Sequence, residues 1–153
     1  MTKTEATFKI QNGNFPEVLK NMFLGKEDPF DWSFKDPYHV FNDGAPSLPE
    51  SYLPLFESGA FTYFYDENKK EYLAFHLESP EEKHIYGNNI QCLWAGIILN
   101  LIDDETDLYE LETLSYKIGF NYAKDLYRKM QEYMEKGLDY EETKKDILKL
   151  CMS

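Results

Sequence analysis

The sequence is poor in basic residues, and this shortage argues against a nucleic-acid ligand. Its 153 residues hold 16 Lys and Arg against 28 Asp and Glu, a net charge of −12. A nucleic-acid-binding protein gains affinity by neutralising phosphates with basic side chains, and no segment here carries a basic stripe. The acidic excess is spread out, with 13 acidic and 8 basic residues in 103–153 and 15 and 8 in 1–102. It therefore serves solubility or attracts a basic partner, and both interpretations stay open.

Cysteines and long apolar runs are also scarce. Cys92 and Cys151 are far apart in the sequence and form no Cys-x-x-Cys motif. This pattern favours reduced thiols in the cytoplasm. The first ten residues lack an apolar run of signal-peptide length, and the longest apolar stretch, residues 90–102, contains Asn100. We therefore expect neither secretion nor a membrane span.

Core-forming residues are plentiful, because the chain is 42% hydrophobic and contains 12 Tyr, 11 Phe and 2 Trp. Such a composition is typical of a folded globular chain. The length suits one hydrophobic core better than two, so we predict a single domain over residues 1–153. We expect an α+β fold with a central antiparallel sheet, helices packed against it and a C-terminal helical segment.

The N-terminal third predicts short elements separated by turns. Residues 7–11 favour a strand, and Asn14 with the following proline favours a helix that ends before Gly25. Residues 26–47, rich in Asp, Pro and aromatic side chains, predict turns around one or two short strands. Residues 47–57 predict a short helix with a proline inside it.

The middle of the chain predicts a β-hairpin followed by a buried helix. Residues 61–65 and 71–77 are aromatic, strand-like runs on either side of a polar turn, and a third strand is expected at 83–86. The hairpin aromatics pack the sheet or form a partner site, and both interpretations stay open. Residues 90–102 are apolar nearly all the way round, so we expect the central core helix there, capped by Asn88 or Asn89.

The C-terminal third predicts helices. Apolar residues recur at three- and four-residue steps, which indicates a buried stripe: Leu108, Leu111, Leu114, Ile118, Tyr122, Leu126, Met130 and Tyr133. The stripe belongs to one long helix or to two helices joined at Gly119. Gly137 ends it, and Asp139 with Glu142 has the spacing of a capping box for a last helix.

No residue pattern predicts catalysis or a cofactor. The chain has no Gly-x-Ser-x-Gly motif, so nucleophilic hydrolysis is not indicated. Five potential ligands lie near one another in the sequence but lack a metal-ligand spacing, so we interpret them as solvated loop residues: His76, Glu78, Glu81, Glu82 and His84. The acidic run at 103–107 lacks the glycine and final glutamate of an EF-hand and is interpreted as an acidic turn before a helix. Paired carboxylates have no required spacing, so a glycosidase stays open. We predict no enzyme, no cofactor and no metal.

Residues 48–59, LPESYLPLFESG, resemble the Leu-Pro-x-x-Tyr-x-x-x-Phe opening helix of the SUKH superfamily. The order that follows is similar as well: a β-meander with a polar hairpin between aromatic strands, then a helix on the sheet, here residues 88–102. The resemblance covers residues 14–104, and residues 105–153 are predicted to be a C-terminal helical appendage. The resemblance to this superfamily implies that the chain is an immunity protein, which binds and neutralises a toxin.

These observations lead to one functional hypothesis, an immunity-type protein whose partner is a basic toxin domain. Acidic loop residues are the predicted partner-binding positions: Asp28, Asp31, Asp36, Asp43, Glu78, Glu81 and Glu82. A regulatory adaptor of the same fold is the first alternative, and a small hydrolase is the second.

Overall fold

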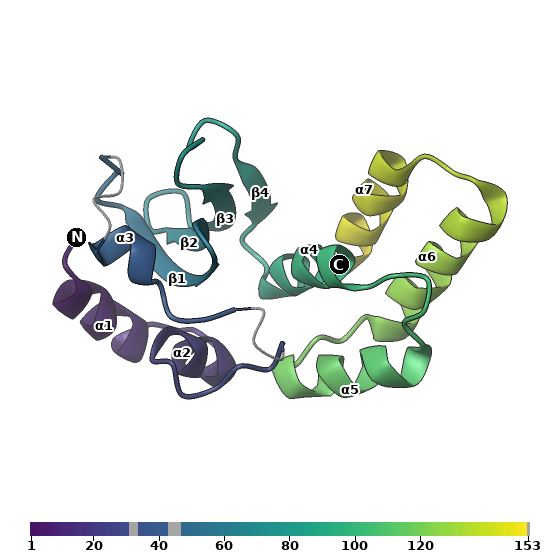
Figure 1. Cartoon of the computed structure of the whole chain (residues 1–153), viewed down its shortest axis with the longest axis horizontal. Helices are drawn as coiled ribbons and strands as arrows, with labels where there is room; N and C mark the ends of the chain where they lie inside the picture. Colours follow the sequence, from purple (N-terminus) through teal and green to yellow (C-terminus); the bar gives the residue numbers. More distant parts are fainter. Residues whose placement is uncertain (31–33, 43–46, 153) are drawn as a thin grey trace. The chain divides into compact units, whose positions relative to one another are not determined.

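The structure, a computed structural model, describes residues 1–30, 34–42 and 47–152. The chain divides into two compact units, Met1–Asn88 and Asn89–Ser153 (Figure 1). The first unit contains the sheet and the second is helical. The organisation as one domain, with a core at 14–104 and an appendage at 105–153, stays a prediction.

The first unit combines three helices with an antiparallel sheet within its described residues. The helices are α1 (Lys3–Asn12), α2 (Glu17–Phe23) and α3 (Tyr38–Asn42). The strands are β1 (Tyr52–Ser58), β2 (Phe61–Asp66), β3 (Glu71–His76) and β4 (His84–Gly87), paired in sequence order. Helices α1 and α2 pack on each other and on β1. The predicted hairpin and the predicted third strand are confirmed.

Aromatic side chains of the hairpin fill the core of this unit. Phe64 of β2 and Phe75 of β3 are fully buried and stacked, with their ring centroids 4.8 Å apart. On the opposite face of β2, Tyr63 is buried and stacks on Phe56 of β1 at 4.9 Å. Successive side chains of a strand point to opposite faces, so aromatic packing occupies both faces of β2. For Tyr63 and Phe64, packing rather than partner binding is the role that the structure supports.

The predicted helix at residues 47–57 is wrong, because Tyr52–Ser58 forms strand β1. Pro54 explains this outcome: it has no N–H for a helix interior, whereas an edge strand tolerates proline. β1 is an edge strand, and its register with β2 shifts between Pro54 and Phe56. The residues that carry the SUKH resemblance therefore form a strand where the resemblance implies a helix.

Two further expectations for the N-terminal third are corrected. Residues 7–11 belong to helix α1, which begins at a capping box in which Thr2 accepts a hydrogen bond from the backbone of Glu5. Residues 26–47 contain the short helix α3 and one isolated bridge, Lys35 to Glu57, in their described part. The helix expected after Asn14 is confirmed as α2, with Pro16 at its N-cap.

The second unit contains four helices within the described chain. They are α4 (Ile90–Leu101), α5 (Leu108–Ile118), α6 (Ala123–Lys136) and α7 (Tyr140–Cys151). α7 packs against α4 and α6, and α6 also packs against α5. Asn89 caps α4 and Asp139 caps α7, as predicted. Gly119, with φ of 75°, ends α5 in a left-handed conformation that favours glycine, so the C-terminal stripe lies on two helices.

The structure confirms the predicted α+β class. The sheet and its helices form the first unit, and helices follow to the C-terminus. In the ranges that the structure describes, every helix is too short or too polar to cross a membrane.

Candidate functional site

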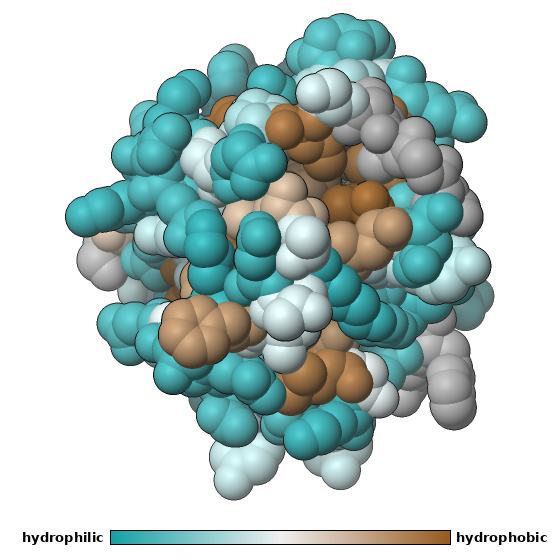
Figure 2. Space-filling model, turned by 90° about the vertical axis from the view of Figure 1, so that its left-hand side faces the viewer, coloured by the Kyte–Doolittle hydropathy of each residue, from teal (hydrophilic) through white to brown (hydrophobic). Residues whose placement is uncertain are grey.

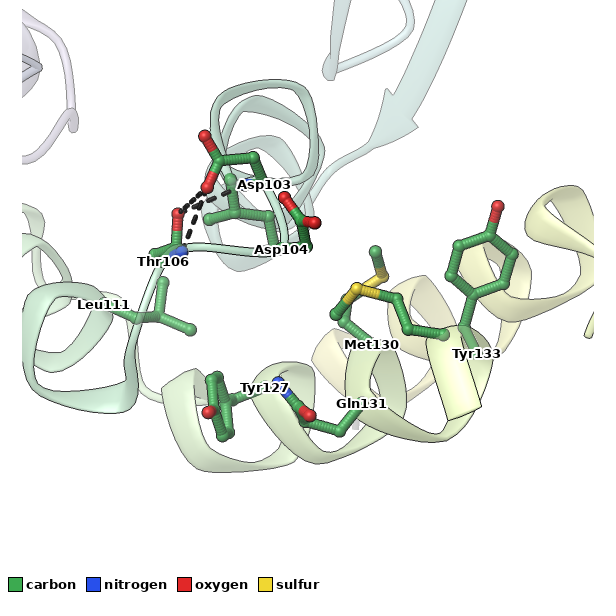
Figure 3. A pocket seen from close by; sticks show the side chains of 10 residues that line it. Asp103, Asp104, Thr106, Leu111, Tyr127, Met130, Gln131 and Tyr133 are labelled. Atoms are coloured by element: carbon green, nitrogen blue, oxygen red, sulfur yellow. Dashed lines mark hydrogen bonds between the residues drawn. The ribbon is translucent and has the colours of Figure 1, made fainter. Parts of the chain in front are cut away.

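The second unit contains an apolar pocket between the α4–α5 turn and helix α6 (Figure 3). Its volume is about 180 Å³. The turn contributes Asp103, Asp104 and Thr106, and α6 contributes Tyr127, Met130, Gln131, Tyr133 and Met134. Ile102 and Leu111 complete the lining. Figure 3 shows the turn residues across an open space from Tyr127, Gln131 and Met130.

A network of hydrogen bonds fixes the turn at the mouth of this pocket. Asp103 Oδ1 accepts hydrogen bonds from the backbone N–H groups of Glu105 at 2.9 Å and Thr106 at 3.0 Å. The Thr106 hydroxyl donates to the same oxygen at 3.1 Å. Asp107 then caps α5 by accepting from the N–H of Glu110 at 2.8 Å. The acidic run is therefore an interhelix turn that starts the next helix, as predicted.

Asp104 differs from its neighbour because its carboxylate is free of hydrogen bonds and ion pairs to the residues that the structure describes. Its side chain is exposed at the pocket mouth. Asp103 and Asp104 are both acidic, and no Lys or Arg is among the described residues that line the pocket. A cationic group beside the apolar lining could therefore pair with the Asp104 carboxylate without breaking an existing hydrogen bond or ion pair.

The apolar face of α6 becomes progressively more exposed toward the C-terminal end of the helix. Leu126 is 1% exposed, Met130 is half-buried and Met134 is 40% exposed. Leu138, just after the helix, is 44% exposed. Leu126, Met130 and Met134 follow one another at four-residue steps and so lie on one side of the helix, whereas Leu138 follows the left-handed Gly137 that ends it. The stripe predicted from the sequence is thus buried at Leu126 and half-buried at its last members, Met130 and Tyr133, and the exposed Met134 lies beyond it.

The predicted partner-binding acids lie elsewhere, in the first unit. Glu78, Glu81 and Glu82 are exposed on the loop between β3 and β4, so the structure gathers these three carboxylates. Asp28 is half-buried, and its carboxylate accepts a hydrogen bond from the N–H of Phe30 at 3.1 Å. That bond shapes a local turn and occupies one oxygen of Asp28.

The remaining predicted acids differ in what the structure describes. Asp36 is half-buried, close to Gly25. Asp31 and Asp43 lie outside the described residues. Of the loop group before β1, the structure thus places Asp28 and Asp36, both less exposed than the glutamates of the β3–β4 loop.

The first unit has a cavity of its own, with a polar lining and a volume of about 350 Å³. Lys9 and Glu67 form an ion pair of 2.6 Å at its wall. Tyr65 and Tyr72 line it as well, with burial raising the pKa of the Tyr72 hydroxyl to about 12. Both charges of this cavity are paired with each other, so it is a weaker candidate for binding a charged partner.

The face of the molecule on the side of α1 shows hydrophobic areas surrounded by hydrophilic side chains (Figure 2). Among the described residues of the first unit, the large exposed hydrophobic ones are Phe8 of α1, Tyr38 of α3 and Ile85 of β4. Hydrophobic side chains exposed singly are normal for a protein surface. Exposed hydrophobic residues that line a pocket are found in the second unit: Met134 at the end of α6, and Tyr116 of α5 at a separate, open hollow beside Phe120.

His39 is hydrogen-bonded to the buried Glu57, and both cysteines lie within the protein interior. His39 Nδ1 lies 2.7 Å from Glu57 Oε1, and the His39 N–H donates to Glu57 Oε2 at 3.1 Å, which fixes α3 to β1. Cys92 and Cys151 are free and buried, and burial raises the pKa of both thiols. No three His, Cys, Asp or Glu side chains in the described ranges lie close enough to hold a metal ion.

Comparison with protein-family models, curated proteins and solved structures gives no match to this chain.

The sequence pointed to part of this pocket. The 103–107 turn and three pocket residues, Leu111, Met130 and Tyr133, were expected as an acidic turn and a buried stripe. Tyr127, Gln131 and Met134 were missed. The signal for Met134 is its four-residue spacing from Met130 and Leu138, which extends the stripe beyond Tyr133.

Proposed function

We propose that this chain is a protein-binding module that captures a basic protein domain. The observation that carries the proposal is the apolar pocket of the second unit. Among the described residues that line it, two are charged, and both are aspartates: Asp103 and Asp104. An exposed apolar patch that continues into a pocket is typical of a protein interaction site. Carboxylates at its rim favour a partner with Lys or Arg next to its apolar contacts.

The overall charge supports the same proposal. A net charge of −12 attracts a basic partner over distances up to about a Debye length, which accelerates association at low salt. The exposed cluster of Glu78, Glu81 and Glu82 adds a local negative surface in the first unit. We propose that the partner is a toxin domain and that binding blocks its basic working surface, as an immunity protein does in the cytoplasm.

Affinity purification of the tagged full chain from its native cell tests the proposal. We expect one basic protein in equal molar amount, released by raising the salt concentration. Expressed alone, that protein should arrest growth, and co-expression of this chain should restore growth. Several unrelated endogenous proteins would favour a regulatory adaptor, and the absence of any partner would contradict the binding function and favour a hydrolase.

A further inference from the structure

The pocket in the second unit is too small for an ordinary small-molecule site. Ligand sites for drug-sized molecules and cofactors measure about 300–1,000 Å³. The volume here is about 180 Å³, in the range expected for one large apolar side chain. Its size therefore favours a single anchoring residue, the usual central feature of a protein interface.

The rim of the pocket identifies the charge of the occupant. Asp104 is exposed and without a partner among the described residues, and Asp103 has one oxygen committed to the turn. A Lys or Arg beside the anchor can pair with Asp104, whereas an acidic residue there would be repelled. Charge complementarity therefore selects a basic occupant.

The lining identifies the form of the occupant. Met130, which is half-buried, and Met134, which is exposed, lie one turn apart on the side of α6 that lines the pocket, and the exposed Leu138 follows the end of the helix. An amphipathic helix lays apolar residues at three- and four-residue steps into such a surface. Methionine side chains are flexible and polarisable, so the pocket adapts to apolar anchors of different shape.

We infer that this pocket holds an amphipathic basic segment of the protein partner. One apolar side chain of the segment enters the space between Leu111, Met130 and Tyr127, and a Lys or Arg one helical turn away pairs with Asp104. This inference rests on the proposed function and specifies which surface of the chain, and which feature of the partner, make the contact.

A designed peptide tests the inference on the full chain. The probe is a helical peptide of leucine and lysine, about four turns long, with all leucines on one side. Two control peptides have the same length: one replaces lysine with glutamate, and the other replaces leucine with serine. The reporter is the ¹³C-methyl NMR signal of the five methionines: Met1, Met22, Met130, Met134 and Met152.

We expect the leucine–lysine peptide to shift the methyl signals of Met130 and Met134 in a saturable way. The signal of Met22, which is buried in the first unit, should stay unchanged. The glutamate peptide should cause no shift because its charges face Asp104, and the serine peptide should cause none because it has no anchor. Saturable shifts from either control peptide equal to those from the probe would overturn the inference.

Two substitutions that change the net charge equally test whether the lysines of the peptide pair with Asp104. Asp104→Lys should weaken binding of the leucine–lysine peptide about tenfold at low salt. Asp146→Lys makes the same change in net charge on an exposed position of α7 that does not line the pocket, so it should weaken binding by less than about twofold. Equal losses from the two variants would show that the overall charge, and not the pocket, attracts the peptide.

The outcomes separate this inference from the proposed function. If a basic partner co-purifies with the chain but leaves the Met130 and Met134 signals unchanged, the inference is wrong and the proposed function stands. If no basic partner is found, the proposed function is wrong whatever the peptide does. If both methyl signals shift with the concentration of the chain alone, the occupant is a second copy of the chain, and the inference is overturned.

Discussion

Glu57 is a fully buried carboxylate on an edge strand, and its hydrogen bonds explain why it is tolerated there. Its Oε2 atom accepts a hydrogen bond from the backbone N–H of His39, and its Oε1 atom lies 2.7 Å from His39 Nδ1. The backbone of Glu57 pairs with Lys35 in an isolated bridge. One residue thus fixes both Lys35 and helix α3 to β1, so its role is structural.

We expect Glu57→Ala to lower the free energy of unfolding by about 2–4 kcal/mol. The substitution removes the carboxylate that accepts the hydrogen bond from the half-buried His39 N–H, and it opens a space beside β1 where the buried Glu57 side chain was. Urea denaturation of the variant and the parent chain measures the difference. Glu78→Ala, at an exposed position, is the control and should cost less than about 0.5 kcal/mol. Equal effects of the two substitutions would contradict the structural role of Glu57.

The two buried thiols should react slowly in the folded protein. Burial and the neighbouring Cys92 raise the pKa of Cys151 to about 12 from an ordinary value of 9.0, so little reactive thiolate exists at pH 8. Titration with a chromogenic disulfide reagent should modify both thiols far more slowly in the native protein than in guanidinium chloride. Rapid reaction of the native protein would show that one thiol is accessible and ionised.

The same pKa shift predicts how stability changes in alkali. The thiol pKa is higher in the folded state, so the protonated thiol favours folding. This contribution is fully present below about pH 9 and is lost as the pH rises toward 12. A Cys151→Ala variant should therefore show a smaller loss of stability than the parent chain between these pH values, measured by urea denaturation. An identical pH dependence would contradict the shift.

At the scale of the elements, hydrophobic periodicity predicted the hairpin and the C-terminal helices, but not the first helix or the first strand. Helix α1 has a weak apolar pattern, and its clearest signal is the Thr2-x-x-Glu5 capping box, which the sequence interpretation overlooked. Residues 52–56 are an apolar run that by itself fits a buried strand or a helix, and the one signal against a helix interior is Pro54, which the sequence interpretation accepted within a helix. The position of this segment at the edge of the sheet decides between them.

The candidate site was predictable in its parts and not as a whole. The acidic turn follows from Asp103 and Asp107, which are typical turn and N-cap residues. The stripe on α6 follows from the four-residue steps. Their proximity depends on how α5 folds back after the turn and how α6 follows Gly119, and sequence spacing does not specify these tertiary angles.

Among the helices that the structure describes, α4 buries the most residues, and Trp94 is 0% exposed. We expect Trp94→Ala to lower the free energy of unfolding by about 3–5 kcal/mol, because a large ring is replaced by a cavity. Asn100→Ala, at an exposed position of the same helix, should change it by less than about 0.5 kcal/mol. A melting temperature of Trp94→Ala close to that of the parent chain would disprove the role of α4 as a core helix.

At the scale of the whole molecule, acidic residues outnumber basic ones in both the N-terminal and the C-terminal part of the chain. Glu78, Glu81 and Glu82 are exposed and have no ion pair within the described chain. Surface charges of this kind contribute little to stability, and they change association rates more than folding. The sequence predicted this loop as a partner site from its position alone, and that assignment stays a prediction.

Reversing two of these charges should slow the association with the captured partner. For Glu81→Lys with Glu82→Lys, we expect a lower association rate at low salt and little change in dissociation, because rim charges act mainly on encounter. Glu141→Lys with Asp146→Lys gives the same net charge on α7 and is the control. Surface plasmon resonance separates the two rates. If both double variants slow association equally, the β3–β4 loop has no special role.

The central claim is that the chain binds a basic protein through its acidic, partly apolar surface. Isothermal titration of the chain with the co-purified partner, at two salt concentrations, tests it most directly. The account predicts a one-to-one complex whose affinity falls as salt rises and falls further with Asp104→Lys than with Asp146→Lys. An affinity that is independent of salt and unchanged by both substitutions would contradict it.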